Sequence, residues 1–241
     1  MRYPISIQTF ETIINGNYVY VDKTDLVYSL AQAHVCFLSR PRRFGKSLLI
    51  TTLDAYFSGR KDLFKGLKME ALEQQWDVYP IFRIDFAKGR FDVEHGLQKI
   101  LEEYVGAWEE VYGKSGIYTT LSSRFQYVLE QAAAKTGHKC VILIDEYDVP
   151  VAKASANGYY KEMLEVMKSL LQVLKDNTAL RFAVITGCLK IAKESIFTGT
   201  NNFVSDTITA SRLNEYFGFV QSEVDELLKA AGLQKYAESM V

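Results

Sequence analysis

Short, almost uninterrupted apolar runs constrain the fold more than any other feature of this sequence. The clearest are CVILI at residues 140–144 and FAVI within residues 181–187. A strand that is apolar at every position is typical of a parallel sheet that is covered on both faces. Weaker runs at residues 34–40, 80–87 and 203–209 have the same strand-like composition. The sequence therefore predicts five strands.

Segments with the spacing of amphipathic helices separate these runs. Two of their apolar faces are Leu97, Ile100, Leu101, Tyr104, Val105 and Trp108, and Met163, Val166, Met167, Leu170, Leu171 and Leu174. We interpret both faces as core and not as cofactor contacts. The alternation of strand and helix predicts an α/β fold of three layers, a mainly parallel five-stranded sheet with helices on both faces. A last helix is expected at residues 221–231.

Composition limits the classes of function. The 241 residues suit one large domain or two small ones, and the net charge of -1 argues against a generally basic nucleic-acid-binding surface. The sequence contains neither a membrane-spanning apolar stretch nor a secretory signal, so we expect a cytoplasmic protein. The three cysteines lack paired spacing and indicate reduced thiols; they are Cys36, Cys140 and Cys188.

The segment SRPRRFGKS at residues 39–47, called the basic loop below, lies between a predicted strand and a predicted helix. Gly45, Lys46 and Ser47 form the end of a phosphate-binding pattern, in which the lysine reaches phosphates and the hydroxyl binds Mg²⁺. Arg40 stands where that pattern has its first glycine. The alternative interpretation is therefore a solvated basic turn.

A second motif favours phosphate chemistry. The run at residues 140–144 ends in two adjacent carboxylates, Asp145 and Glu146. At such a strand end the first carboxylate typically supports Mg²⁺ and the second acts as general base. Both motifs follow strands, and open α/β sheets bind ligands at the carboxyl ends of their strands. Together they predict a P-loop NTPase fold, and we expect the two motif strands to be neighbours in the sheet.

Several longer segments resemble the bacterial AAA-ATPase-like family, P-loop ATPases of the additional-strand class. They are YPISIQTFETI, YVDKT, FLSRPRRFGKSLL, LIDEYD and TGCLKIAKESIFTGTNNF. The resemblance implies one domain over residues 1–241, with residues 1–33 packed on it and a further C-terminal region starting after about residue 220. In that family a basic loop without the first glycine is usual, and members often continue into a PD-(D/E)XK nuclease-like domain.

The resemblance implies ATP and Mg²⁺ as cofactors and assigns roles to residues. The phosphate-binding residues would be Pro41, Arg42, Arg43, Phe44, Gly45, Lys46, Ser47 and Leu48. Ser47 and Asp145 would hold the metal, and the catalytic residues would be Glu146, Lys46 and Thr186. For Thr186 a sensor of the γ-phosphate and a cap of the following turn remain equal alternatives.

Other roles stay open at this stage. YVDKT could contact the adenine or cap a helix through Thr24 or Asp25, and Asp148 is expected to start a turn. The arginines of the basic loop could contact phosphate, an acidic partner or DNA. No arginine finger is assigned; Arg124 and Arg212 are the candidates.

The leading functional prediction is slow Mg-dependent ATP hydrolysis that drives a conformational switch. One alternative is a nucleotide-binding regulatory or interaction module with little hydrolysis. Another is the motor part of a DNA-acting or defence protein, although the overall charge gives nucleic acid no support. A homo-oligomer or a protein partner is compatible with each, and no membrane association is expected.

Overall fold

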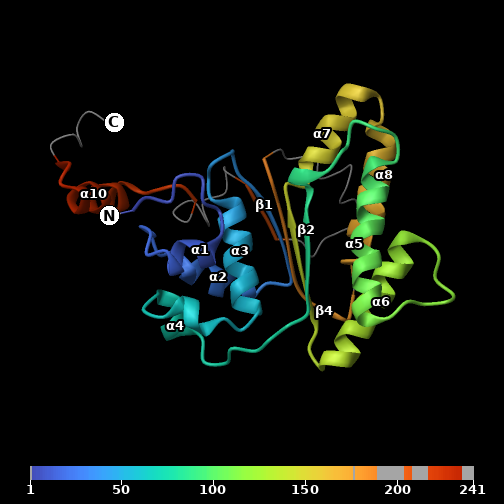
Figure 1. Ribbon diagram of the computed structural model, residues 1–241, viewed down its shortest axis with the longest axis horizontal. Helices are drawn as coiled ribbons and strands as arrows, with labels where there is room; N and C mark the ends of the chain where they lie inside the picture. The colour runs from blue at the N-terminus through green and yellow to red at the C-terminus, as the bar shows by residue number, and fades with distance from the viewer. Residues whose placement is uncertain (1, 176, 189–203, 208–216, 235–241) are drawn as a thin grey trace.

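A computed structural model describes residues 2–175, 177–188, 204–207 and 217–234 (Figure 1). The elements in chain order are α1 (Phe10–Asn15), α2 (Thr24–Ala31), β1 (Val35–Ser39), α3 (Lys46–Phe57), the 3₁₀ helix η1 (Lys61–Phe64), α4 (Lys68–Leu72), β2 (Ile81–Asp85), the 3₁₀ helix η2 (Phe86–Lys88), α5 (Gly96–Tyr112), α6 (Leu121–Thr136), β3 (Cys140–Asp145), α7 (Asp148–Asn157), α8 (Tyr160–Gln172), β4 (Leu180–Gly187), β5 (Val204–Thr207) and α10 (Gln221–Ala231). None of the helices in these ranges is long and apolar enough to cross a membrane.

The strands form one five-stranded sheet in the order β2-β3-β4-β1-β5, and every neighbouring pair is parallel. This confirms the predicted α/β class, including the weak fifth strand. Every residue of β1 and of β3 is buried, whereas burial alternates along β2, which among the described strands pairs only with β3. The continuous apolar runs thus belong to inner strands, as their pattern predicts.

Helices cover both faces of the sheet: α1 to α4 lie on one side and α5 to α8 on the other (Figure 1). Successive residues of β3 alternate between the two cores. Val141 and Leu143 pack with the first group of helices, and Ile142 and Ile144 pack with the second. Two apolar cores therefore hold the central strands rigidly, which fixes the positions of the loops at their ends.

The expectation that the two motif strands are neighbours is wrong, because β4 lies between β1 and β3. Val184 of β4 is in register with Cys36 of β1 on one side and with Leu143 of β3 on the other. The order of strands depends on pairing between distant segments, which the local pattern does not encode. This insertion places Thr186, near the end of β4, between the two motifs.

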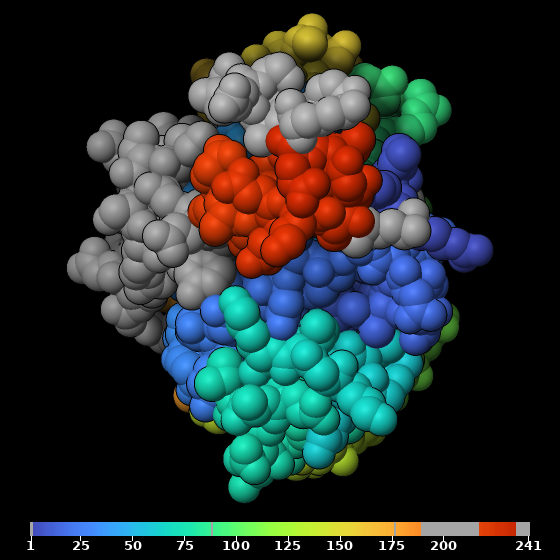
Figure 2. Space-filling view, turned by 90° about the vertical axis from the view of Figure 1, so that its left-hand side faces the viewer, coloured from blue at the N-terminus to red at the C-terminus, as the bar shows by residue number. Residues whose placement is uncertain are grey.

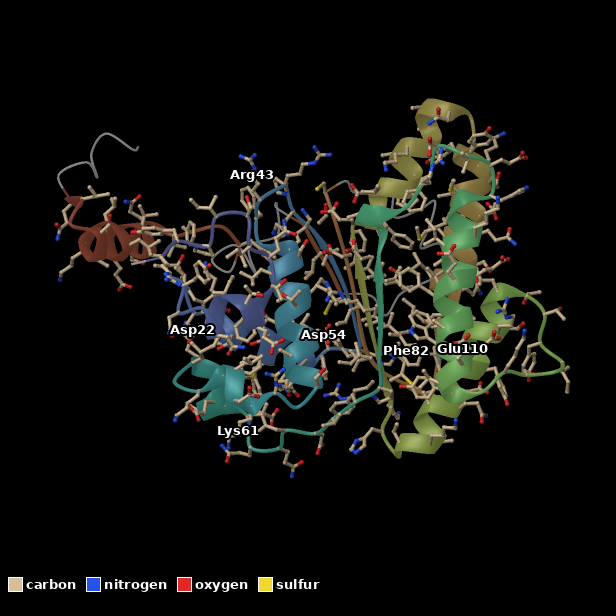
Figure 3. The ribbon with its side chains drawn as sticks, viewed as in Figure 1. Asp22, Arg43, Asp54, Lys61, Phe82 and Glu110 are labelled. Atoms are coloured by element: carbon tan, nitrogen blue, oxygen red, sulfur yellow. The ribbon has the colours of Figure 1, made fainter. Side chains whose placement is uncertain are left out.

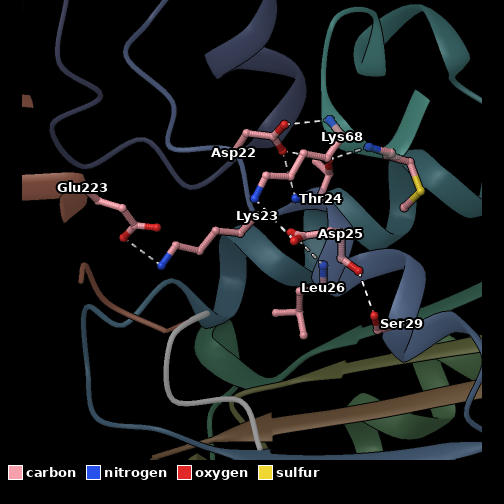
Figure 4. Close-up of polar contacts among 9 residues, drawn as sticks. Asp22, Lys23, Thr24, Asp25, Leu26, Ser29, Lys68 and Glu223 are labelled. Carbon is pink, nitrogen blue, oxygen red and sulfur yellow. Dashed lines mark hydrogen bonds and ion pairs between the residues drawn. The ribbon is translucent and has the colours of Figure 1, made fainter. Parts of the chain in front are cut away.

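The segment YVDKT begins a helix whose N-cap position is Lys23, so neither Thr24 nor Asp25 is the N-cap residue. Asp25 still satisfies one N–H group of the first turn, since its Oδ1 accepts from Leu26 at 3.1 Å (Figure 4). Asp22 caps the N–H group of the first helical residue, since its Oδ1 accepts hydrogen bonds from the backbone N–H of Thr24 at 2.9 Å and from the Thr24 hydroxyl at 2.7 Å. Its Oδ2 accepts from the backbone N–H of Lys68 at 2.7 Å, which joins α2 to α4. Asp22 precedes the helix by two residues, so its carboxylate reaches the first free N–H groups.

Asp148 is the first residue of α7 and does not start an isolated turn. Pro150 follows in the first turn of that helix, where its missing N–H removes no helical hydrogen bond. The sequence-based expectation of a turn was wrong because proline is compatible with either a turn or a helix start.

Helix α10 lies against the N-terminal part of the chain (Figure 2). Lys23 Nζ lies 3.0 Å from Glu223 Oε2 of α10 and donates to the carbonyl of Gly218 at 3.0 Å. Glu223 also accepts from the N–H of Val220 at 2.9 Å, which fixes the start of the helix. A residue of the YVDKT segment thus holds the described C-terminal helix in place.

Candidate functional site

The carboxyl ends of β1, β4 and β3 meet at one edge of the sheet. The N–H of Arg40 donates to the carbonyl of Gly187 at 3.1 Å, and the N–H of Tyr147 donates to that of Thr186 at 3.0 Å. A Cβ atom at Gly187 would lie 2.5 Å from the Tyr147 ring and from a carboxylate oxygen of Asp148. The basic loop and the loop after β3 are therefore packed tightly against the end of β4.

The basic loop leads into the N-terminus of α3, where Gly45 is the N-cap residue with a φ of 79°. Arg43 also has a positive φ, 69°, and its side chain points away from the sheet (Figure 3). Within the described residues no side chain caps α3, and its first turn contains no acidic residue. Free N–H groups and the helix dipole make such an end attractive to anions.

Lys46 presents a buried ammonium group to this edge, with only 5% of the residue exposed. Its Nζ donates to the carbonyl of Pro41 at 3.1 Å and to Cys188 Sγ at 3.2 Å. No carboxylate of the described part of the chain forms an ion pair with it. Buried charges are normally paired, so this ammonium is suited to receive an anionic ligand.

Asp145 at the end of β3 is 3% exposed. Its Oδ1 accepts from the hydroxyl of Thr186 at 2.5 Å and from the N–H of Glu146 at 3.0 Å. Thr186 is fully buried and its hydroxyl orients Asp145, an arrangement that neither sequence-based interpretation of this threonine anticipated. Both bonds use Oδ1, so no hydrogen bond from the described residues occupies Oδ2 of Asp145.

Glu146 follows in a left-handed backbone conformation with a φ of 54°. Its partial burial raises the pKa of its carboxyl above the ordinary range, and Asp145 and Asp148 raise it further. Lys46 and Arg42 oppose this shift, so both cations lie close enough to act on the carboxylate. A raised pKa moves a carboxylate toward the range in which general bases operate, and strained backbone is common at functional sites.

The family model of the AAA-ATPase-like proteins, described as predicted AAA-ATPases, matches residues 4–197. The chain belongs to the AAA-ATPase-like family. It is also similar to the "Uncharacterized protein in vnfD 5'region" of Azotobacter chroococcum mcd 1, with 36% identity over 231 residues. That alignment covers 93% of this chain and 44% of the relative, so the chain spans less than half of that protein's length.

In this AAA-ATPase-like chain the arginines of the basic loop do not form one anion-binding patch. Arg40 is 2% exposed, and its guanidinium lies 4.6 Å from the centre of the Phe217 ring. Its Nη1 also donates to the carbonyl of Ser39 at 2.9 Å. Arg42 and Arg43 are exposed. The residue in place of the first glycine thus connects the basic loop to the segment before α10.

A mainly apolar cavity of about 420 Å³ lies beside the basic loop. The N-terminal segment, the basic loop, α3 and the segment before α10 contribute to its walls, and its aromatic members are Tyr3, Tyr20, Phe44, Phe217 and Phe219. Lys23 and Arg43 also line this cavity. Sequence reasoning missed Phe217 and Phe219 as lining residues, since they lie far from every motif in the chain. YVDKT therefore both begins a helix and lines a cavity.

Arg124, a candidate arginine finger, stabilises the packing of two helices in this AAA-ATPase-like chain. Its Nε and Nη2 donate to the two carboxylate oxygens of Glu109 at 2.9 and 2.7 Å, which joins α6 to α5. The other candidate, Arg212, lies outside the described residues.

Replacing Arg124 with alanine should lower the free energy of unfolding by about 2–4 kcal/mol, because it leaves the buried carboxylate of Glu109 unpaired. Arg124 holds the pKa of Glu109 below its ordinary value of 4.5, so the pair stabilises the fold above that pH and loses its effect in acid. Denaturant unfolding at neutral and acidic pH measures both effects, and the difference between variant and parent should shrink in acid. Lys168→Ala, which breaks the exposed pair with Glu165, is the control and should cost less than about 1 kcal/mol. Equal losses for both variants would contradict this role of Arg124.

Proposed function

We propose that this chain binds ATP with Mg²⁺ at the carboxyl edge of its sheet and hydrolyses it slowly to drive a conformational switch. Family membership supports nucleotide binding at a coarse level. The observation that carries the finer proposal is Lys46, a buried ammonium without a carboxylate partner among the described residues, beside the uncapped N-terminus of α3. An ammonium and free helix N–H groups that converge on one place suit the β- and γ-phosphates.

The residues present fit Mg²⁺ as well. Asp145 offers Oδ2 as a hard oxygen ligand, and the hydroxyl of Ser47 lies in the first turn of α3. The described residues hold no group of three or more His, Cys, Asp or Glu that could bind a metal alone. That agrees with Mg²⁺ sites that use one carboxylate and complete their shell with substrate phosphates. Bound there, the ion would neutralise charge that develops on the phosphates.

Glu146 supplies the base for hydrolysis in this proposal. Its carboxylate lies near Lys46, which would contact the phosphates, and its raised pKa favours acceptance of a proton from water. Thr186 acts through Asp145 as a positioning residue. The left-handed backbone conformation of Glu146 costs about 1–3 kcal/mol, a strain that is common at functional sites.

The apolar cavity beside the basic loop is suited to the base of the nucleotide. Its volume of about 420 Å³ lies within the usual range for small-molecule sites, and its aromatic walls favour stacking with a planar ring. Arg43, Phe44 and Gly45 line it and also belong to the phosphate-binding loop. A nucleotide could therefore span both sites.

The conformational switch has a physical basis in the contacts of α10. Phe217 lines the apolar cavity and stacks on Arg40, while Glu223 pairs with Lys23. A ligand in the cavity would touch the segment that holds α10 and alter these contacts. We propose that nucleotide occupancy is transmitted to the C-terminal side of the chain along this path.

Calorimetric titration with Mg-ATP and with Mg-tripolyphosphate tests the two parts of the site. We expect saturable binding of both and competition between them, because both carry the phosphates that Lys46 receives. ATP should bind at least about tenfold more tightly, equivalent to about 1.4 kcal/mol, since it alone fills the apolar cavity. Equal affinities would remove the cavity from the proposal, and no binding of either ligand would overturn it.

A further inference from the structure

Cys188 directly follows β4 and lies against the phosphate-binding lysine. Its Sγ accepts a hydrogen bond from Lys46 Nζ at 3.2 Å. Its backbone is fixed on both sides, as the N–H donates to Asp148 Oδ1 at 3.1 Å and the carbonyl accepts from Ser39 Oγ at 3.3 Å. The sulfur is therefore held beside the ammonium by β1, β4 and α7.

The three cysteines of the chain differ in access. Cys36 in β1 and Cys140 in β3 are fully buried, and burial raises the pKa of Cys140 to about 12. Cys188 is partly exposed. Reagents in solution should therefore reach Cys188 well before the other two.

Lys46 gives an independent reason to expect a ligand at this sulfur. Lys46 is only 5% exposed, and within the described ranges its hydrogen-bond partners are neutral, the carbonyl of Pro41 and the thiol. An anionic phosphate would be a stronger partner for the ammonium than either of them. A phosphate at Lys46 must then displace the sulfur or cover it.

We propose that Cys188 is a modification site at which a covalent group on the sulfur and a nucleotide at Lys46 exclude each other. This inference rests on the nucleotide binding proposed above. The natural reagent would be a peroxide: the sulfur attacks one peroxide oxygen, the S–O bond forms as the O–O bond breaks, and the thiol proton leaves with the departing oxygen. With hydrogen peroxide the products are cysteine sulfenic acid and water, the sulfur being oxidised by two electrons. A thiol reductant reverses the step, which makes nucleotide binding sensitive to redox conditions.

Labelling with N-ethylmaleimide tests this exclusion directly. The sulfur adds to the maleimide double bond, and the thiol proton ends on the neighbouring carbon. Mass spectrometry of the protein and its peptides should find one rapid adduct, at Cys188. Mg-ATP at ten times its dissociation constant should slow this adduct about tenfold, because exclusive binding leaves roughly a tenth of the sites free.

Peroxide treatment gives the reverse measurement. Oxidised protein should lose at least about tenfold in affinity for Mg-ATP, and dithiothreitol should restore it. Cys188→Ser is the matched control, because a hydroxyl also accepts from Lys46 but does not form a sulfenic acid. The affinity of the Cys188→Ser variant for Mg-ATP should be the same before and after peroxide treatment.

The outcomes separate this inference from the proposed function. Untreated protein that binds Mg-ATP, yet whose Cys188 is labelled at the same rate with and without it, would overturn the exclusion alone. Rapid labelling of Cys36 or Cys140 ahead of Cys188 would overturn it as well. Untreated protein that does not bind Mg-ATP would overturn the proposed function and, with it, this inference.

Discussion

Lys46→Ala is expected to lower the affinity for Mg-ATP by two to three orders of magnitude. The variant removes the buried side chain of the first residue of α3, whose ammonium has no carboxylate partner in the described ranges. Loss of one partner from a buried charge pair costs about 2–5 kcal/mol, or about 1.5 to 3.5 orders of magnitude in affinity, and the expected loss lies within this range. Calorimetric titration of the variant and of the parent protein with Mg-ATP measures this loss of affinity.

Lys61→Ala is the matched control for this prediction. Lys61 is an exposed lysine of η1 at the opposite edge of the molecule from Arg43 (Figure 3). Its replacement should leave the affinity for Mg-ATP unchanged, and thermal unfolding of both variants verifies that each is folded. A folded Lys46→Ala variant that binds as tightly as the parent would contradict the assignment of the phosphate site.

Glu146→Gln is expected to lower turnover of Mg-ATP by about 10²–10⁴-fold while affinity stays within a few-fold. The amide preserves the size of the side chain and removes the proton acceptor. Steady-state phosphate release and calorimetric binding, measured on the same preparation, separate the two effects. Glu110→Gln, at an exposed carboxylate of α5, should change neither. Unchanged turnover in Glu146→Gln would instead support a nucleotide-binding regulatory module.

The raised pKa of Glu146 adds a dependence on pH. Turnover by the parent protein should fall as Glu146 is protonated, at a pH above the ordinary carboxyl value of 4.5, and the residual turnover of the variant should lack this fall.

The folded protein binds this proton more tightly than the unfolded chain, so Glu146 stabilises the fold in acid and destabilises it near neutrality. Glu146→Gln should therefore melt at a higher temperature than the parent near neutrality, and this difference should vanish in acid.

Local sequence was enough to predict the five strands and the helices whose apolar residues are regularly spaced. The continuous apolar run of β3, the helical spacing of α5 and α8, and the glycine at the start of α3 each act over a few residues. Short-range sterics and the period of apolar residues determine such features directly. The motif residues Lys46, Asp145 and Glu146 could be found for the same reason, since each lies at the end of an element that its own neighbours specify.

Only the tertiary structure decided which of these elements meet. Lys46 and Cys188 lie 142 positions apart in the chain, and the insertion of β4 between β1 and β3 brings them into contact. Tertiary packing also brings Arg40 against the ring of Phe217 and the hydroxyl of Thr186 against Asp145, which are distant pairs in the chain. Strand order follows from the packing of whole faces against two cores, and no local pattern records it. The sequence by itself thus determined the two motifs and the strands that carry them, and the packing of the sheet determined their partners.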